Sequence, residues 1–186
     1  MRYRKFHRTS LIALVVPLLL IGLQIYQKNQ QDKPLSATST ATSAVVLHDI
    51  ATRSKVVNCL SSGPFPDSSC TPGAVIPSVT TAQICTAGYS KSVRNVTQVE
   101  KDAVFSEYGI ISHTAGQYEI DHFVSLELGG SNDIANLWPE AALPEPGFHQ
   151  KDLVENLLHD QVCSGKVDLA TAQKEEISNW LALYHP

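Results

Sequence analysis

The chain has 186 residues with an ordinary globular composition, 43% hydrophobic and 17% charged, which excludes a collagen-like or a fully disordered protein. Once a removable N-terminal stretch is set aside, the length allows one domain with a real hydrophobic core. Residues 1–33 hold six of the 14 Lys and Arg, which leaves eight basic and seventeen acidic residues, a formal charge of −9, for the remainder. This balance argues against broad electrostatic adhesion to nucleic acid, because counterion release needs clustered Lys and Arg.

Residues 1–27 have the pattern of an export signal. Four basic residues among the first eight positions precede an apolar run from Leu11 to Tyr26, which is longer than a usual signal-peptide core and slightly short for a membrane-spanning helix. The nearest small-x-small cleavage candidate, residues 42–44, lies well beyond this run. We therefore prefer an uncleaved signal anchor to a cleaved signal peptide, with the basic end cytoplasmic. Both interpretations export the domain to the periplasm or the cell exterior, and an anchor would also tether it to the cytoplasmic membrane.

The four cysteines form an even set without any C-x-x-C spacing: Cys59, Cys70, Cys85 and Cys163. This pattern favours two disulfides in an oxidising compartment over a four-thiolate zinc site. Four cysteines allow three pairings, and the spacing does not choose among them. Cys163 lies far from the others, so any bridge that it makes joins the C-terminal helices to the N-terminal half of the chain.

Composition places a linker before the folded domain. Residues 28–58 begin with Gln, Ser, Thr and Ala and few large apolar groups, which is typical of a solvated linker. The domain is expected over residues 59–186. Its first part, residues 59–81, is dense in Pro, Gly and Ser, which indicates loops that disulfides would help to order.

The rest of the domain is expected to be of the α+β class. In chain order, the expected elements are a helix over 99–108, a strand over 118–128, a turn over 129–133, a short strand around 136–138, a helix over 149–162 and a helix from an N-cap at Asp168 to Trp180. The helix over 149–162 has an apolar face made of Val154, Leu157, Leu158 and Val162. Its opposite edge, which can face a site, carries His149, Asp152 and Asn156.

The stretch YEIDHFVSLELGGSNDIANLWPE, residues 118–140, places an acid beside an imidazole in a strand-like run. A Gly-Gly-Ser turn and Asn-Leu-Trp follow, and HQK opens the next helix. This order of Asp-His, Asn and His resembles the ββα-metal unit of HNH endonucleases, and the match covers Glu119 to about Lys151. The segments CTPGAV, ICTAGYS, SVRNV and KDLVENLLHDQVCSGKVDLATAQ are similar to the flanks of a group of exported bacterial HNH-type proteins. The resemblance implies an HNH-like ββα-metal core with additional helices and loops stapled by disulfides.

The resemblance implies roles for four side chains. His122 would be the general base, because a neutral imidazole can take a proton from water at physiological pH. Asp121 and His149 would bind a divalent cation, Mg²⁺ or Mn²⁺ by preference, with Zn²⁺ as an alternative. Asn136 would bridge the backbone of the turn and so keep His122 aimed. Because adjacent strand residues point to opposite faces, Asp121 and His122 can serve one site only if the strand ends or bulges there.

The last metal ligand has alternatives. The final His of the HNH family often lies nearer its Asn than His149 lies to Asn136. The Pro-rich insertion between the two positions can absorb that difference, or the ligand could instead be Asn156 or His159.

Four further charged residues are weaker candidates. Glu119 and Asp152 are outside candidates for the metal site, since an acid beside a helix N-terminus also has a role as a dipole partner. Lys151 and Arg94 could contact phosphates, although a single cation is more often a solvated surface charge.

Together these patterns predict an exported or membrane-tethered, metal-dependent endonuclease with little base-sequence preference and no small-molecule cofactor. DNA is the favoured substrate, and the shortage of Lys and Arg leaves no extended surface for reading a sequence. The rival interpretation is a disulfide-stapled, cell-surface binding module that keeps an HNH-like shape without hydrolysis, which the acidic composition fits better. The sequence leaves open DNA versus RNA, the physiological metal and the oligomeric state.

Overall fold

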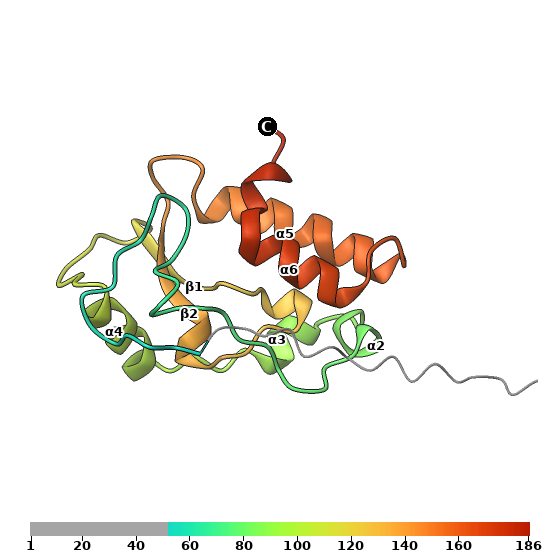
Figure 1. Cartoon of the computed structure of the whole chain (residues 1–186), viewed down its shortest axis with the longest axis horizontal. Helices are drawn as coiled ribbons and strands as arrows, with labels where there is room; N and C mark the ends of the chain where they lie inside the picture. The colour runs from blue at the N-terminus through green and yellow to red at the C-terminus, as the bar shows by residue number, and fades with distance from the viewer. Residues whose placement is uncertain (1–51) are drawn as a thin grey trace, which may run out of the picture. The chain divides into compact units, whose positions relative to one another are not determined.

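The computed structural model describes residues 52–186, so the predicted export segment and most of the predicted linker lie outside the described residues. Within the described range, no helix combines the length and the apolar character needed to cross a membrane. The elements in Figure 1 are α2 (Thr81–Ile84), α3 (Tyr89–Val93), α4 (Gln98–Glu107), β1 (Tyr118–His122), η1 (Leu126–Leu128), η2 (Ile134–Asn136), β2 (Leu137–Ala141), α5 (Phe148–Cys163), α6 (Leu169–Asn179) and η3 (Trp180–Ala182).

Helices and one small antiparallel sheet make up the described part of the chain, which is compatible with the α+β class. The helices predicted over 99–108, over 149–162 and from Asp168 are confirmed as α4, α5 and α6. Capping side chains explain two of their starts, because Thr97 accepts from the backbone N–H of Glu100 and Asp168 from that of Thr171. Residues 59–80 form loops and isolated bridges, as their composition predicted.

The two strands form a regular hairpin in which Asp121 lies opposite Trp138 and His122 opposite Leu137. Because directly opposed residues share a face and successive residues alternate, Asp121 and His122 leave β1 on opposite faces. No bulge interrupts the pairing of residues 118–122 with residues 137–141. β1 does end at His122, which is the other condition under which both side chains could serve one site.

The prediction of a strand reaching residue 128 is wrong, and the side chain of Asn136 explains why. Beyond His122, the Asn136 amide accepts from Val124 N at 2.8 Å and donates to Val124 O at 2.9 Å. The side chain thus replaces the main-chain partner that a continuing strand would need. The chain then turns through η1. Only glycine fits at position 130, because a Cβ there would lie 1.8 Å from Val124 O. The turn over residues 129–133 lies between η1 and η2, as expected.

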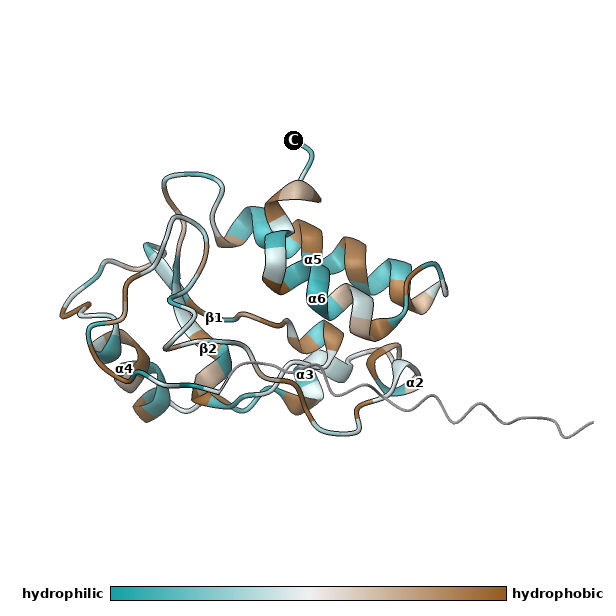
Figure 2. Cartoon of the chain, viewed as in Figure 1, coloured by the Kyte–Doolittle hydropathy of each residue, from teal (hydrophilic) through white to brown (hydrophobic). Residues whose placement is uncertain are grey.

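Two hydrophobic clusters pack the helices around the hairpin. The smaller cluster joins α4 to both strands through Val104, Ile120 and Leu137. The larger one lies between α5, α6 and the preceding loops, and its buried members are Val79, Ile84, Leu128, Val154, Leu158, Val162, Ala172 and Trp180. Figure 2 shows apolar and polar positions alternating along both helices. Leu157 was predicted on the apolar face but is 40% exposed, because the buried stripe of α5 follows a spacing of four residues.

The disulfides are Cys59–Cys70 and Cys85–Cys163. Cys85 follows α2 and Cys163 ends α5, so the second bridge joins the C-terminal helices to the N-terminal half, as expected. Two disulfides indicate an oxidising environment, extracellular or periplasmic.

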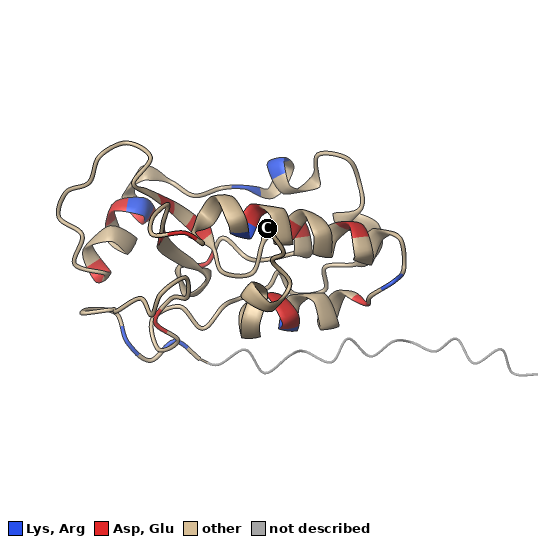
Figure 3. Ribbon diagram, turned by 90° about the horizontal axis from the view of Figure 1, so that it is seen from above, with Lys and Arg blue, Asp and Glu red and all other residues tan. Residues whose placement is uncertain are grey.

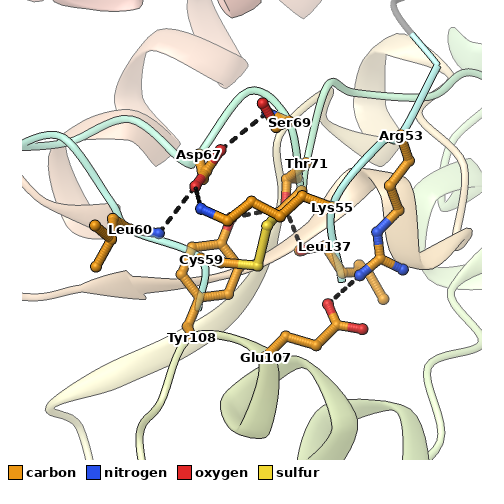
Figure 4. The surroundings of a disulfide bond; sticks show 11 residues. Arg53, Lys55, Cys59, Leu60, Asp67, Ser69, Thr71, Glu107, Tyr108 and Leu137 are labelled. Atoms are coloured by element: carbon orange, nitrogen blue, oxygen red, sulfur yellow. Dashed lines mark hydrogen bonds and ion pairs between the residues drawn. A yellow bond between two sulfur atoms is a disulfide. The ribbon is translucent and has the colours of Figure 1, made fainter. Parts of the chain in front are cut away.

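Ion pairs surround the first disulfide, as Figure 4 shows. Lys55 donates to Asp67 Oδ2 at 2.8 Å, and the pKa of Asp67 falls to about 2 mainly because of this hydrogen bond. Arg53 pairs with Glu107 at the end of α4. Contacts with the domain therefore begin before Cys59.

Candidate functional site

The imidazole of His122 is almost fully buried at the end of β1, with 1% of its surface exposed. Its Nε2 lies 3.1 Å from Asn132 Oδ1. The orientation of that amide is fixed, because Asn132 Nδ2 donates to Val93 O at 2.8 Å and Oδ1 also accepts from Asn95 N at 3.1 Å. An amide oxygen only accepts, so Nε2 carries the proton and donates it.

The second ring nitrogen of His122 has no protein partner. Nδ1 is buried, and nothing within residues 52–186 forms a hydrogen bond with it. Burial lowers the pKa of His122 to about 4, against the opposing effects of Asp121 and Asn132. At neutral pH the ring is therefore uncharged, and Nδ1 holds a free lone pair that can accept a proton.

Asn136 is completely buried and uses its whole amide. In addition to both bonds with Val124, it donates to Ser131 O at 2.8 Å and accepts from Ala74 N at 3.1 Å. This is the bridging of the turn that was expected of Asn136. The residue that holds the ring of His122, however, is Asn132, which the sequence did not single out.

Asp121 faces α5, where Lys151 binds it. Lys151 Nζ donates to Asp121 Oδ2 at 2.8 Å, to His122 O at 3.0 Å and to Glu155. The ammonium group has three protons and all are used, while the side chain is 1% exposed. The prediction that Lys151 contacts a phosphate is therefore wrong: this cation neutralises buried carboxylates and fixes Asp121.

Four carboxylates gather around the single ammonium group of Lys151: Asp121, Glu140, Glu155 and Glu176. Burial raises the pKa of Glu140 to about 10 and that of Glu155 to about 7, while Lys151 opposes both shifts. Burial also raises the pKa of Glu176. For Asp121, burial is outweighed by Lys151 and other neighbours, and the pKa is lowered. Asp121 is thus the member of this group that stays ionised.

Two exposed acids lie near Asp121 at the surface. Burial and then the charge of Asp121 raise the pKa of both Glu119 and Asp152, which shows that the three carboxylates repel one another. The guanidinium of Arg94 acts on both acids in the opposite direction. Figure 3 shows the Lys and Arg positions spread over the ribbon, with no one place where most of them gather.

The candidates for the last metal ligand lie at different places along α5. His149 is exposed at the first turn, with its ring 4.2 Å from that of Phe148. Asn156 donates to Asp152 O within the helix. His159 bonds Ile84 O at 3.1 Å, and at about 1.5 Å per residue it lies roughly 12 Å along the helix from Lys151. The alternative that His159 and Asp121 share one ion is therefore wrong.

The predicted cation can be tested against these donors. Among the described residues, Asp121 belongs to no group of three His, Cys, Asp or Glu donor atoms within 4.8 Å of one another. Its Oδ2 is taken by Lys151, which leaves one carboxylate oxygen. A closed tetrahedral zinc site does not fit such a set. Mg²⁺ needs fewer protein donors, because it is usually bound through one or two carboxylates and several waters.

One compact donor group does lie elsewhere, where Cys85, His159 and Cys163 bring their ligand atoms within 4.8 Å of one another. This Cys-His-Cys group could bind a metal, and its geometry does not set which one. The two sulfurs form the second disulfide, so metal binding would require the reduced thiolates.

Sequence patterns missed four residues of this site: Asn132, Glu140, Glu155 and Glu176. Asn132 had a detectable signal, since it lies in the turn that precedes Asn136. The three acids had none, because nothing in a sequence marks a Glu on a helix or strand as buried. Comparison of the chain with protein-family models, with curated proteins and with solved structures gave no match.

Proposed function

We propose that the protein is an exported, metal-dependent endonuclease of the HNH type, which hydrolyses phosphodiester bonds with low sequence specificity. The observation that carries this proposal is the buried imidazole of His122. Its Nε2 is committed to Asn132, and its Nδ1 keeps an unpartnered lone pair. A purely structural buried histidine is expected to satisfy both ring nitrogens. One fixed and one free nitrogen is the arrangement that a general base needs.

His122 would take the proton from the attacking water through Nδ1. A pKa of about 4 keeps the ring neutral at pH 7 but makes it a weak base. An arriving phosphate is negatively charged and favours the imidazolium form, so substrate binding raises the pKa towards the range in which proton transfer is efficient. The water would then attack phosphorus in line with the leaving oxygen.

Asp121 would hold the cation, with Glu119, Asp152 or His149 and water completing its shell. Once bound, Mg²⁺ or Mn²⁺ would neutralise charge on the scissile phosphate and its leaving oxygen. Lys151 would keep the Asp121 carboxylate in place by occupying one of its oxygens. This restricts the cation to the other oxygen and so to one side of the carboxylate.

The substrate would be nucleic acid, with DNA favoured. A shortage of surface cations supports low sequence specificity, because reading bases requires the backbone to be fixed first. The apolar run at residues 11–26 would anchor the domain in the cytoplasmic membrane, on the outer side.

Plasmid cleavage by the full chain tests the proposal. With Mg²⁺ or Mn²⁺ we expect nicked or linear products, and His122→Ala should slow cleavage by about 10²–10⁴-fold, the usual contribution of a general base. His185→Ala, which removes an exposed imidazole near the C-terminus, should cut like the unmodified protein. Equal cutting by His122→Ala would remove His122 from the mechanism. If the unmodified protein fails to cut DNA or RNA with either metal, the nuclease proposal is wrong.

A cell-surface binding module with an HNH-like shape is the second candidate. The burial of Lys151 favours a binding module, because a buried Lys151 leaves the surface with one cation fewer for contacting phosphates. Calorimetric titration with Mn²⁺ separates the two functions. A nuclease should bind Mn²⁺ saturably and lose that binding in Asp121→Asn, whereas a binding module should show no dependence on Asp121.

A further inference from the structure

A cavity of about 490 Å³ opens beside the candidate site. It lies between α4, the loop before β1 and the first half of β1. A second cavity of about 390 Å³ shares Asp102, Phe105 and His113 with it, so the two cavities are neighbours. Pockets of roughly 300–1,000 Å³ are the usual size for small organic ligands.

Two cations face this cavity without ion-pair partners. Arg94 and Lys101 both line it, and neither forms a salt bridge with any residue between 52 and 186. The lining also contains two acids, Glu119 and Asp102, and Asp102 accepts from Gln98 at 2.7 Å. The wall is thus not simply basic: its two cations are available to a ligand, and its acids restrict where an anion can lie.

Aromatic rings form another part of the wall. The rings of Phe105 and His113 meet edge to face with centroids 4.2 Å apart. His113 and Tyr118 are nearly parallel, with an interplanar angle of 28° and centroids 6.3 Å apart. His113 is exposed, so its ring can be reached from solvent. Aromatic faces beside cations are the combination that proteins use to bind unpaired nucleotides.

The cavity borders the strand that carries the candidate site. Glu119 and Ile120 line it and immediately precede Asp121 and His122 in β1, which are not among its lining residues. A nucleotide bound in the cavity would therefore lie next to the strand that carries the Asp-His pair. A duplex keeps its bases stacked and paired, so it does not present a base face to these rings, whereas an unpaired base can turn into the cavity.

We propose that this cavity binds an unpaired nucleotide of a single strand, with the phosphates on Arg94 and Lys101 and the base against His113 and Tyr118. The proposal rests on the nuclease function and deepens it, because it makes single-stranded nucleic acid, or an unpaired region of a duplex, the preferred substrate. Binding is measurable without hydrolysis, so the two proposals can fail separately.

Fluorescence anisotropy of the full chain with a labelled single-stranded oligothymidylate in EDTA tests the cavity. We expect the duplex of the same length to bind more weakly. His113→Ala should weaken single-strand binding by at least about fivefold, the lower end for loss of one stacked base. The double variant Arg94→Gln, Lys101→Gln should lower the slope of log affinity against log salt by about 0.7 for each lost phosphate contact.

Matched controls use exposed residues outside the cavity. His185→Ala and Lys166→Gln should leave affinity and salt slope unchanged. Equal binding of single strands by the unmodified protein and both cavity variants would overturn the proposal, even if plasmid cleavage is observed. Binding lost in the cavity variants would support it, even if no cleavage is found. Equal or tighter binding of the duplex would also overturn it.

Discussion

Asn132 orients the imidazole of His122. One end of the amide lies 3.1 Å from His122 Nε2, and the other end donates to the backbone of Val93 at 2.8 Å. A flip of the amide would break both bonds, so the tautomer of His122 is set by a residue ten positions away in sequence and by a helix further upstream.

Asn132→Asp should raise the pKa of His122. A carboxylate at this position favours the imidazolium, and an opposite charge at such a distance raises the pKa by about 1–3. The present value is about 4, and NMR titration of the ring would follow the change. Asn179→Asp, at the exposed last residue of α6, is the control and should leave the titration unaltered. An unchanged titration in Asn132→Asp would show that the amide does not face the ring in solution.

Asn136→Leu should destabilise the fold strongly. The change leaves two N–H groups and two carbonyls without their amide partner, and each buried polar group left unsatisfied costs about 1–3 kcal/mol. We expect a loss of at least about 3 kcal/mol in the free energy of unfolding, measured by urea denaturation. Asn156→Ala, on the exposed face of α5, should stay within about 0.5 kcal/mol. A small effect at Asn136 would mean that water replaces the amide.

Lys151→Met should also destabilise the fold, because it leaves buried carboxylates without their cation. Removing one partner of a buried ion pair costs about 3–5 kcal/mol. Lys174→Met removes an exposed cation from α6 and is the matched control, with an expected change within about 0.5 kcal/mol. Were the two variants equally stable at pH 7, the carboxylates around Lys151 would have to be protonated.

Glu140 should make stability fall as pH rises above neutrality. Its pKa is about 10 in the folded protein and 4.5 ordinarily, so between these values the unfolded chain has lost a proton that the folded chain retains. Stability then decreases with pH, by at most about 1.4 kcal/mol per pH unit for one group. Asp121, whose pKa is lowered, contributes stability that is lost only in acid, below its ordinary value of 3.8.

Denaturation between pH 7.5 and 9 avoids the titration of Glu155 near pH 7, while Glu176, whose pKa is also raised by burial, adds to the slope in the same direction. Glu140→Gln should make the slope less steep, since an amide cannot ionise. Glu145→Gln, at an exposed loop position, should keep the slope of the unmodified protein. The same slope in Glu140→Gln would show that Glu140 is already ionised in the fold.

Loss of the Cys85–Cys163 bridge should cost more stability than loss of Cys59–Cys70. The bridges span 78 and 11 residues, and closing the longer loop removes more entropy from the unfolded chain. The chain-entropy relation gives about 4.5 kcal/mol for Cys85→Ser with Cys163→Ser, and about 2.8 kcal/mol for Cys59→Ser with Cys70→Ser. Paired Ser variants in thermal denaturation would measure both losses. The reverse order would imply that native contacts, rather than loop length, decide the difference.

Local signals predicted the helices well. Capping residues and apolar spacing placed α4, α5 and α6 within a few residues of their observed ends, because those signals act between neighbours in sequence. The end of β1 could not be predicted in this way. It depends on the Asn136 side chain, which reaches back to Val124 only after the turn has folded.

The candidate site was predicted only in part, because it also depends on contacts between segments that are distant in sequence. Asp121 and His122 could be recognised as a pair, but their surroundings come from four other segments of the chain. Lys151 looked like a surface cation because a single Lys is more often a solvated surface charge. Its burial follows from the packing of α5 on the hairpin and on Glu176 of α6, which no local pattern records.

Because Val93 and Asn95 hold the Asn132 amide, the candidate site extends beyond the hairpin and α5. A fragment starting after residue 95 would retain the whole hairpin and α5, with every residue that a motif search would select. It would still lack the backbone groups that hold the Asn132 amide, so nothing would fix which face of that amide meets the imidazole of His122. The hairpin and helix are therefore not a transplantable module, and grafting them onto another scaffold would transfer the side chains without their alignment.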